Sequence, residues 1–135
     1  MNNLSETVEV TVRFSEVDAM QIVWHGSYLH YLEDAREAFC LKWGFGYHRI
    51  YKLGFVAPVV DLKIRYLHSA TFGEHLWTTV TLQPQRGAKL VFSYIIKNEI
   101  GDTVLTAQST QLFTTIKGEL IVSRPEFLDS LYSQI

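Results

Sequence analysis

The sequence predicts an α+β fold in which a curved antiparallel sheet covers one long helix. Apolar and polar residues alternate near the N-terminus and again through most of the chain after residue 58, which is the period of half-buried strands. Between these regions, residues 27–43 have the period of a helix. No other helical segment is long enough to connect parallel strands, so we expect antiparallel pairing. The sheet must then bury the helix.

The first strand is expected over residues 8–14. The apolar residues that alternate there with polar ones are Val8, Val10, Val12 and Phe14. The alternation stops at Ser15, and a turn segment continues to Gly26.

The long helix is expected over residues 27–43, where apolar side chains fall on one side at about 100° per residue. These are Tyr28, Tyr31, Leu32, Ala35, Phe39 and Trp43. The apolar arc is wide, which indicates a helix more enclosed than a surface helix. Gly44 and Gly46 suit the end of this helix, and a shorter helix follows at residues 47–53.

The remaining elements are mostly strands, which read as an antiparallel meander. Strands are expected over residues 60–66, 76–82, 90–96 and 103–116, with Gly- and Pro-containing turns between them. Pro125 is suited to open a short helix that continues to Tyr132. Without a repeat or a linker, residues 1–135 form a single domain.

Composition excludes several classes of function. A formal net charge of −2 provides no basic field for nucleic acid. No run of about 18 apolar residues is present, so we expect no membrane insertion. The N-terminal residues do not resemble a secretion signal, and we expect a cytoplasmic protein. Cys40 is the only cysteine, and the five histidines show no metal-binding spacing, so we expect no metal site.

Asp18 is the candidate for chemistry. It lies in a turn and is followed by apolar residues, and partial desolvation raises the basicity of a carboxylate. The long helix begins shortly afterwards, and its first N–H groups can stabilise a developing oxyanion. Together these groups would make a minimal acyl-transfer site. The alternative is that Asp18 only forms the turn and Ser27 only caps the helix.

The run from Asp18 to Leu29, continued by residues 31–36, resembles the hot-dog thioesterases of the 4-hydroxybenzoyl-CoA thioesterase type. It is also similar to the related bacterial acyl-CoA thioesterases. The resemblance continues weakly at Ile64–Tyr66 and at Arg124–Pro125. It implies a hot-dog fold, a homodimer or homotetramer, and a substrate that contains coenzyme A. It implies no metal or redox cofactor.

By this resemblance, Asp18 corresponds to the catalytic aspartate, which acts either as nucleophile or as general base. The backbone N–H of His25 corresponds to the donor that polarises the thioester carbonyl. The His25 side chain either orients water or substrate, or is an exposed residue at the start of the helix. The sequence departs from the family at Met20-Gln21, where many members have a glycine, and at Ser69.

Four further residues are candidates for binding the substrate. Trp24 and Tyr28 are suited to an apolar or aromatic acyl pocket, although either can equally be core. Arg86 and Lys89 lie around Gly87 in a turn, and the resemblance implies contact with the phosphates of coenzyme A. The alternative for these two cations is a solvated hairpin tip.

The sequence therefore predicts a thioesterase that hydrolyses an acyl-CoA, or an acyl chain on a carrier protein, to the free acid and thiol. Two other functions stay open. A hot-dog dehydratase would act on a hydroxyacyl thioester and would pair a histidine and an acid across a dimer. A non-catalytic acyl-thioester binding protein would retain its ligand and release no thiol. The identity of the acyl group cannot be predicted from the sequence.

Overall fold

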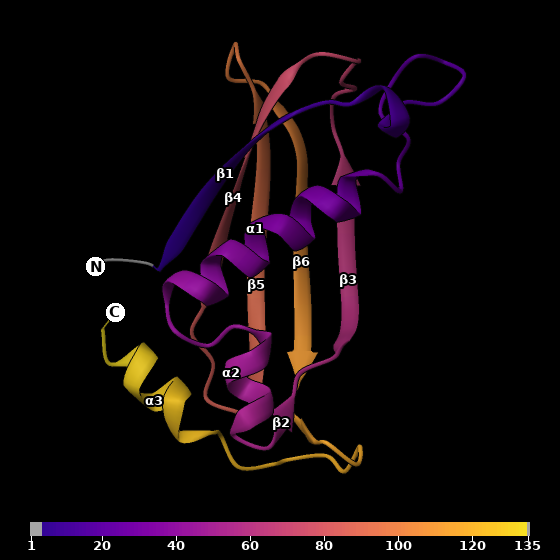
Figure 1. Cartoon of the computed structure of the whole chain (residues 1–135). Helices are drawn as coiled ribbons and strands as arrows, with labels where there is room; N and C mark the ends of the chain where they lie inside the picture. The colour runs from indigo at the N-terminus through magenta and orange to yellow at the C-terminus, as the bar shows by residue number, and fades with distance from the viewer. Residues whose placement is uncertain (1–3, 135) are drawn as a thin grey trace.

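The computed structural model describes residues 4–134 and contains a five-stranded antiparallel sheet with a long helix across one face (Figure 1). The strand order is β1-β4-β5-β6-β3. The strands are β1 (Ser5–Thr11), β3 (Val59–Tyr66), β4 (His75–Gln83), β5 (Lys89–Asn98) and β6 (Thr103–Leu112), and the helix is α1 (Tyr28–Lys42). This arrangement confirms the predicted fold class.

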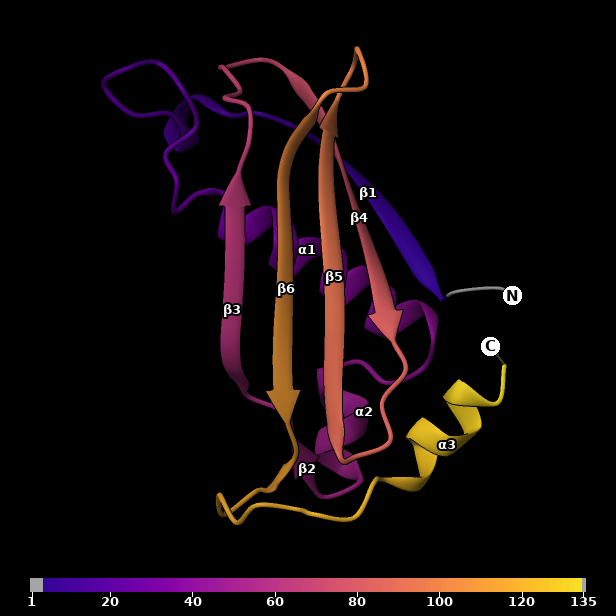
Figure 2. The same cartoon turned by 180° about the vertical axis from the view of Figure 1, so that it is seen from behind.

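The smaller elements lie at the ends of the sheet. At one end, a 3₁₀ turn (Phe14–Glu16) leads into the loop before α1. At the other end lie α2 (Tyr47–Lys52), α3 (Glu126–Tyr132), and the pair formed by β2 (Phe55–Val56) and β7 (Thr114–Thr115). Figure 2 shows the opposite face of the sheet, across which no described helix runs. Among residues 4–134, no helix has the length and apolar character needed to cross a membrane.

The helix α1 buries the side that the sequence predicts. Tyr31, Leu32, Ala35 and Phe39 are buried there, while the residues of the opposite side are exposed. The ring of Phe39 meets that of Phe92 on β5 edge-on, with centroids 5.3 Å apart. Each large apolar side chain buried in this way contributes about 1.5–3 kcal/mol to folding. The sheet and α1 therefore hold each other in place.

The first strand was predicted to continue to Phe14, and this is wrong. The strand β1 ends at Thr11, and the Phe14 side chain is 76% exposed in the 3₁₀ turn. Val12 is buried outside the strand, where its N–H donates to the carbonyl of Glu74 at 2.9 Å. Alternation therefore continues past the end of the strand because the loop also buries an apolar side chain.

The predicted meander is correct only for β4, β5 and β6, which are consecutive neighbours. The strand β3 pairs with β6 at the far edge of the sheet instead of with β4. Its residues are exposed except for Ile64, which is partly buried against the core, although the alternation predicted a half-buried strand. The predicted strand at residues 103–116 is divided, since β6 ends before the buried Phe113 and β7 follows.

Candidate active site

Asp18 and His25 lie together in a cleft of about 400 Å³ at one end of the sheet. The cleft is formed by the loop before α1, the first turn of α1 and the segment after β3. Its lining residues are Asp18, Met20, Ile22, Val23, His25, Tyr28, Tyr66, Leu67, His68 and Ser69. In the described part of the chain, no three His, Cys, Asp or Glu side chains converge as metal ligands would.

A tight turn holds Asp18. Its N–H donates to the carbonyl of Ile22 and its carbonyl accepts from Gln21, both at 2.9 Å. The N–H of Met20 donates to Oδ1 of Asp18 at 2.8 Å. Within residues 4–134, Oδ2 of Asp18 has no hydrogen-bond partner, so one carboxylate oxygen is open for chemistry. Gln21 has a φ of 67°, a left-handed conformation that glycine adopts without strain and that a residue with a Cβ disfavours.

The start of α1 offers unoccupied donors. Among the described residues, the N–H groups of His25 and Gly26 have no acceptor, whereas the N–H of Ser27 donates to the carbonyl of Trp24 at 2.8 Å. Ser27 is at the N-cap position, but its side chain makes no capping hydrogen bond. These backbone groups, together with the positive end of the helix dipole, can bind a carbonyl oxygen that gains negative charge.

Tyr66, at the end of β3, fixes the His25 peptide. Its hydroxyl donates to the carbonyl oxygen of His25 at 3.0 Å. The Tyr66 ring lies 6.5 Å from the His25 ring and 5.8 Å from the Tyr28 ring, measured between centroids. Sequence reasoning did not assign Tyr66 to the site, because its proximity to His25 depends on the edge position of β3.

A buried carboxylate anchors the loop to α1. Glu16 is only 8% exposed, and its Oε1 accepts from the Tyr31 hydroxyl at 2.9 Å and from the N–H of Arg13 at 2.8 Å. Burial and this bond to Glu16 raise the pKa of Tyr31. The carbonyl of Glu16 also accepts from the N–H of Trp24 at 2.9 Å. Glu16 therefore fixes the position of the Asp18 turn relative to the helix, a role that sequence reasoning missed.

The two aromatic candidates have different positions. Tyr28 is buried and lines the cleft, and burial raises the pKa of its hydroxyl, so the group stays neutral. Trp24 is 50% exposed and does not line the cleft. Its ring lies against that of His25, with centroids 5.0 Å apart. Trp24 can therefore restrict the His25 side chain from outside the cleft.

The two predicted cations do not lie near Asp18 in the same chain. Lys89 begins β5 and pairs with Leu112, while Tyr66 beside the cleft pairs with Leu105 on the same neighbouring strand, β6. Leu105 and Leu112 are seven residues apart on β6, which corresponds to about 24 Å along the strand. The turn with Arg86 is at the end of the sheet opposite the loop before α1 (Figure 1). Phosphate binding by these residues stays a prediction.

The charged and thiol groups of α1 have structural partners or surroundings. Glu33 and Arg36 form an ion pair three residues apart on the helix, with Nη2 of Arg36 2.6 Å from Oε2 of Glu33. Burial raises the pKa of the Cys40 thiol to about 12. A thiol with this pKa is protonated near neutral pH and is a poor nucleophile, as expected for a structural cysteine.

The sequence pattern of the thioesterase-like superfamily matches residues 12–132. A protein of Bacillus subtilis (strain 168) named as a putative acyl-CoA thioesterase, YneP, is 35% identical over 104 residues, which are 77% of this chain and 75% of that protein. The structure of a DHNA-CoA thioesterase from Staphylococcus aureus superposes with a TM-score of 0.86 at 27% identity, over 96% of this chain and 89% of that one.

A mutant 4-hydroxybenzoyl CoA thioesterase in complex with 4-hydroxybenzoyl CoA has the same fold. Its TM-score is 0.81 at 20% identity, and the match covers 93% of this chain and 97% of that one. The sheet and helix described above are therefore a hot-dog fold. From the sequence pattern, the relatives and the fold together, this chain belongs to the thioesterase-like superfamily.

Proposed function

We propose that this protein hydrolyses the thioester of an acyl-CoA, or of an acyl chain on a carrier protein, in the Asp18 cleft. One observation carries the proposal. Asp18, whose carboxylate has an open oxygen, and His25, whose backbone N–H has no acceptor among the described residues, line the same cleft. The similarity to a putative acyl-CoA thioesterase and to a DHNA-CoA thioesterase supports thioester hydrolysis.

In the proposed reaction, the thioester carbonyl oxygen accepts from the N–H groups of His25 and Gly26. Asp18 either attacks the carbonyl carbon itself or takes a proton from the water that attacks it. The C–S bond then breaks, the thiolate leaves and takes up a proton, and water provides the oxygen of the free acid. The His25 side chain orients water or substrate at the rim. Water is the only co-reactant, so no cofactor is needed.

The proposed acyl group contacts Tyr28 on the cleft wall, while Trp24 borders the entrance through its contact with His25. Arg86 and Lys89 bind the phosphates of coenzyme A. Since these cations are at the far end of the same sheet, they reach the Asp18 cleft from a second copy of the chain.

The edge of β3 is where that second copy pairs. Val60 and Leu62 on this strand are 54% and 40% exposed, and its outer backbone groups pair with no described strand. An open edge with exposed apolar side chains is a site for pairing with another chain. The proposed assembly is a homodimer with a sheet that continues through two β3 strands, alone or as half of a homotetramer. Its two-fold axis makes the β3 strands antiparallel.

Replacing Asp18 by Asn tests the proposed chemistry. The rate of hydrolysis of a panel of acyl-CoAs, measured by thiol release, should fall by at least about 10²-fold, which is the lower range for an acid–base group. Thermal unfolding should be unchanged, because the amide still fits the turn. Glu119→Gln, an exposed carboxylate outside the cleft, is the matched control.

Unchanged turnover in Asp18→Asn would refute the assignment. Two further readouts separate the other functions. An enoyl product without free thiol from a hydroxyacyl-CoA would identify a dehydratase. Retention of ligand without thiol release by the wild-type protein would identify a binding protein.

A further inference from the structure

The segment before α3 contains Arg124, whose side chain contacts the turn between β4 and β5. Its Nη1 donates to the carbonyl oxygen of Gln85 at 2.7 Å, between residues that are 39 positions apart in the chain. Figure 1 and Figure 2 both show α3 beside this turn. Arg86, the exposed cation proposed to bind phosphate, is the next residue of the turn. The contact therefore joins the C-terminal part of the chain to a proposed substrate-binding segment.

The β4–β5 turn has little backbone support of its own. The pairing of β4 with β5 ends at Gln83, and the pairing of β5 with β6 begins at Lys89. Among the described residues, no backbone–backbone hydrogen bond outside the strands involves residues 84–88. Lys89 is therefore held by the sheet, whereas Arg86 is not. The bond from Arg124 fixes a part of the turn that the sheet leaves unsupported.

This hydrogen bond acts on the peptide group that joins Gln85 to Arg86. The carbonyl of Gln85 and the N–H of Arg86 belong to one planar unit, so a bond that holds the oxygen also holds the start of the Arg86 backbone. The backbone conformation in turn limits the rotamers that the Arg86 side chain can adopt. Arg124 can thus set the direction in which Arg86 points.

The guanidinium of Arg124 is itself held by α3. Its Nε donates to Oδ1 of Asp129 at 2.7 Å, and its Nη2 is 2.5 Å from the same oxygen. Its Cζ lies 5.3 Å from the centroid of the Tyr132 ring, and burial raises the pKa of the Tyr132 hydroxyl, so this ring stays neutral. With the bond to Gln85, all three guanidinium nitrogens have a partner in the chain. Arg124 is therefore suited to hold the turn and not to bind a phosphate itself.

The helix α3 is a fixed base for this contact. Leu128 and Leu131 of the helix are 0% and 3% exposed. The Phe127 ring lies 5.6 Å from that of Phe45 and 5.8 Å from that of Phe113, measured between centroids. These contacts pack α3 into the same core as the sheet, so a residue held by α3 has a defined position relative to the turn.

A purely structural role for Arg124 is the alternative, in which its ion pair with Asp129 only braces the start of α3. The two side chains are 30% and 55% exposed, and ion pairs at such exposure contribute little to folding. The core contacts already anchor the helix. The bond to Gln85, by contrast, is made to the residue directly before the proposed phosphate ligand.

We propose that Arg124 is a positioning residue for the coenzyme A part of the substrate. By holding the peptide between Gln85 and Arg86 against α3, it orders the turn before the phosphates bind, so less conformational entropy is lost on binding. The inference rests on the proposed thioester hydrolysis and on the proposed phosphate binding by Arg86, and it adds the residue that fixes this cation.

Arg124→Met tests the positioning with two thioesters of the acid that the wild-type protein hydrolyses fastest in the acyl-CoA panel. One is the acyl-CoA, and the other is the N-acetylcysteamine thioester, which has no phosphate. For the acyl-CoA, KM should rise by about 5- to 10-fold, with kcat changed by no more than about 2-fold. For the N-acetylcysteamine thioester, kcat/KM should change by no more than about 2-fold.

Lys97→Met is the matched control. It also removes one positive charge, from an exposed side chain at the other end of β5. It should change the constants of neither thioester, so a loss of attraction between the whole protein and an anionic substrate would appear in this variant as well.

A double variant tests whether Arg124 acts through the turn. Arg86→Met should raise KM for the acyl-CoA at least as much as Arg124→Met does. With both substitutions, KM should stay within about 2-fold of that of Arg86→Met, because positioning a side chain that is absent has no effect. Arg124→Lys keeps the charge but lacks the planar fork that contacts Asp129 and Gln85 together, so its KM should stay at least about 3-fold above that of the wild type.

Isothermal titration with free coenzyme A gives a measurement that does not require hydrolysis. Its Kd should rise by about 5- to 10-fold in Arg124→Met and stay unchanged in Lys97→Met. If Arg124→Met does not fold, Asp129→Asn releases the guanidinium and should raise the same Kd and KM by about 2- to 5-fold.

Four results would each overturn the positioning role: equal losses for both thioesters in Arg124→Met, no loss in it at all, additive effects in the double variant, or full recovery in Arg124→Lys. Failure of the proposed function is distinct, since the wild-type protein would then hydrolyse none of the acyl-CoAs. In that case the titration decides. A higher Kd for coenzyme A in Arg124→Met would support the positioning, and an unchanged Kd or no binding to the wild type would overturn it.

Discussion

At the residue scale, the turn that holds Asp18 contains Gln21 in a backbone conformation that a glutamine disfavours. Gln21 is in the left-handed region at φ 67°, while its N–H donates to the carbonyl of Asp18. A side chain with a Cβ is strained there, and a β-branched one is strained more. The turn that presents the carboxylate is therefore maintained by the surrounding hydrogen bonds.

Substitutions at Gln21 should show this strain. Gln21→Val should lower the free energy of unfolding by about 1–2 kcal/mol, and Gln21→Gly should raise it by up to about 1 kcal/mol, since glycine adopts this φ without strain. Urea unfolding followed by tryptophan fluorescence measures both. If Gln21→Val were more stable than Gln21→Gly, that result would contradict the left-handed conformation of Gln21.

Tyr66 acts on the reaction through the His25 peptide. Tyr66→Phe removes the hydrogen bond to the His25 carbonyl and keeps the ring contacts. We expect kcat to fall by about 3- to 10-fold with KM little changed, because the oxyanion donors would be less well fixed in the transition state. Steady-state kinetics on an acyl-CoA measures the two constants. A loss confined to KM would assign Tyr66 to substrate binding instead.

At the element scale, the periodicity of apolar residues predicted most helices and strands. It did not predict which strands pair with one another or which side chains meet from distant parts of the chain. The helical period placed α1 to within a residue at each end, and the alternation located β4 and β5. Alternation could not show that β3 is an edge strand, since that depends on which strand pairs with it. Glu16 was missed for the same reason, because its partner Tyr31 is 15 residues further along the chain.

The candidate site shows the same difference between residues close together in the sequence and residues far apart in it. The sequence placed Asp18 and the start of the helix together because they are seven to ten residues apart. It did not predict Tyr66, because β3 and the loop before α1 are far apart in the chain.

The packing of α1 predicts a loss of stability at alkaline pH. Burial raises the pKa of Tyr28, of Tyr31 and of Cys40, the last from 9.0 to about 12. The folded state keeps these protons where the unfolded state loses them. The stabilisation is therefore complete below pH 9 and decreases as the pH rises towards 12.

Urea unfolding at pH 8 and pH 10.5 measures this effect. The midpoint should be lower at pH 10.5, with about 1–2 kcal/mol of the difference due to Cys40. In Cys40→Ala, the stability should depend less on pH over this range. A midpoint that rises with pH would contradict the burial of these groups.

At the scale of the whole molecule, the exposed β3 edge should determine the assembly. We expect light scattering to give at least a dimer at micromolar concentration. Leu62→Glu places a charge on each of two facing strands and should shift the protein to monomer, with loss of thioester hydrolysis. Val122→Glu, which changes an apolar residue that is 82% exposed outside β3, should leave the assembly unchanged. A wild-type monomer would refute the paired sheet.

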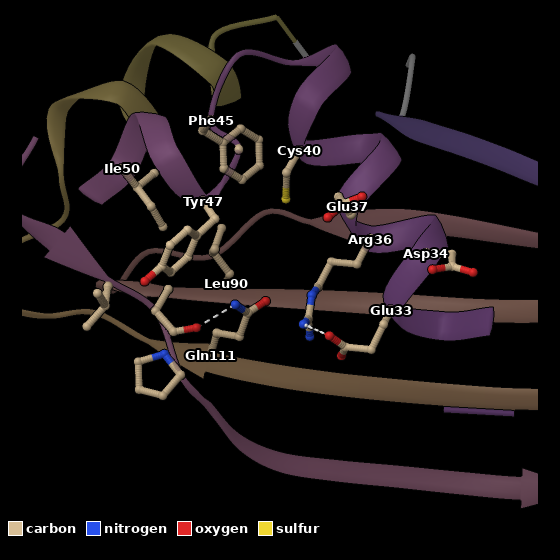
Figure 3. Close-up of a pocket in the computed structure, with 14 residues that line it drawn as sticks. Glu33, Asp34, Arg36, Glu37, Cys40, Phe45, Tyr47, Ile50, Leu90 and Gln111 are labelled. Carbon is tan, nitrogen blue, oxygen red and sulfur yellow. Dashed lines mark hydrogen bonds and ion pairs between the residues drawn. The ribbon is translucent and has the colours of Figure 1, made fainter. Parts of the chain in front are cut away.

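The Asp18 cleft is separate from a second cavity of about 540 Å³ between α1, α2 and the start of β3 (Figure 3), and this separation has a consequence for how such proteins diversify. Residues 18–28 hold the carboxylate and the carbonyl donors, whereas residues 33–58 with Leu90 and Gln111 line the second cavity. Substitutions in the second set can accumulate without disturbing the first.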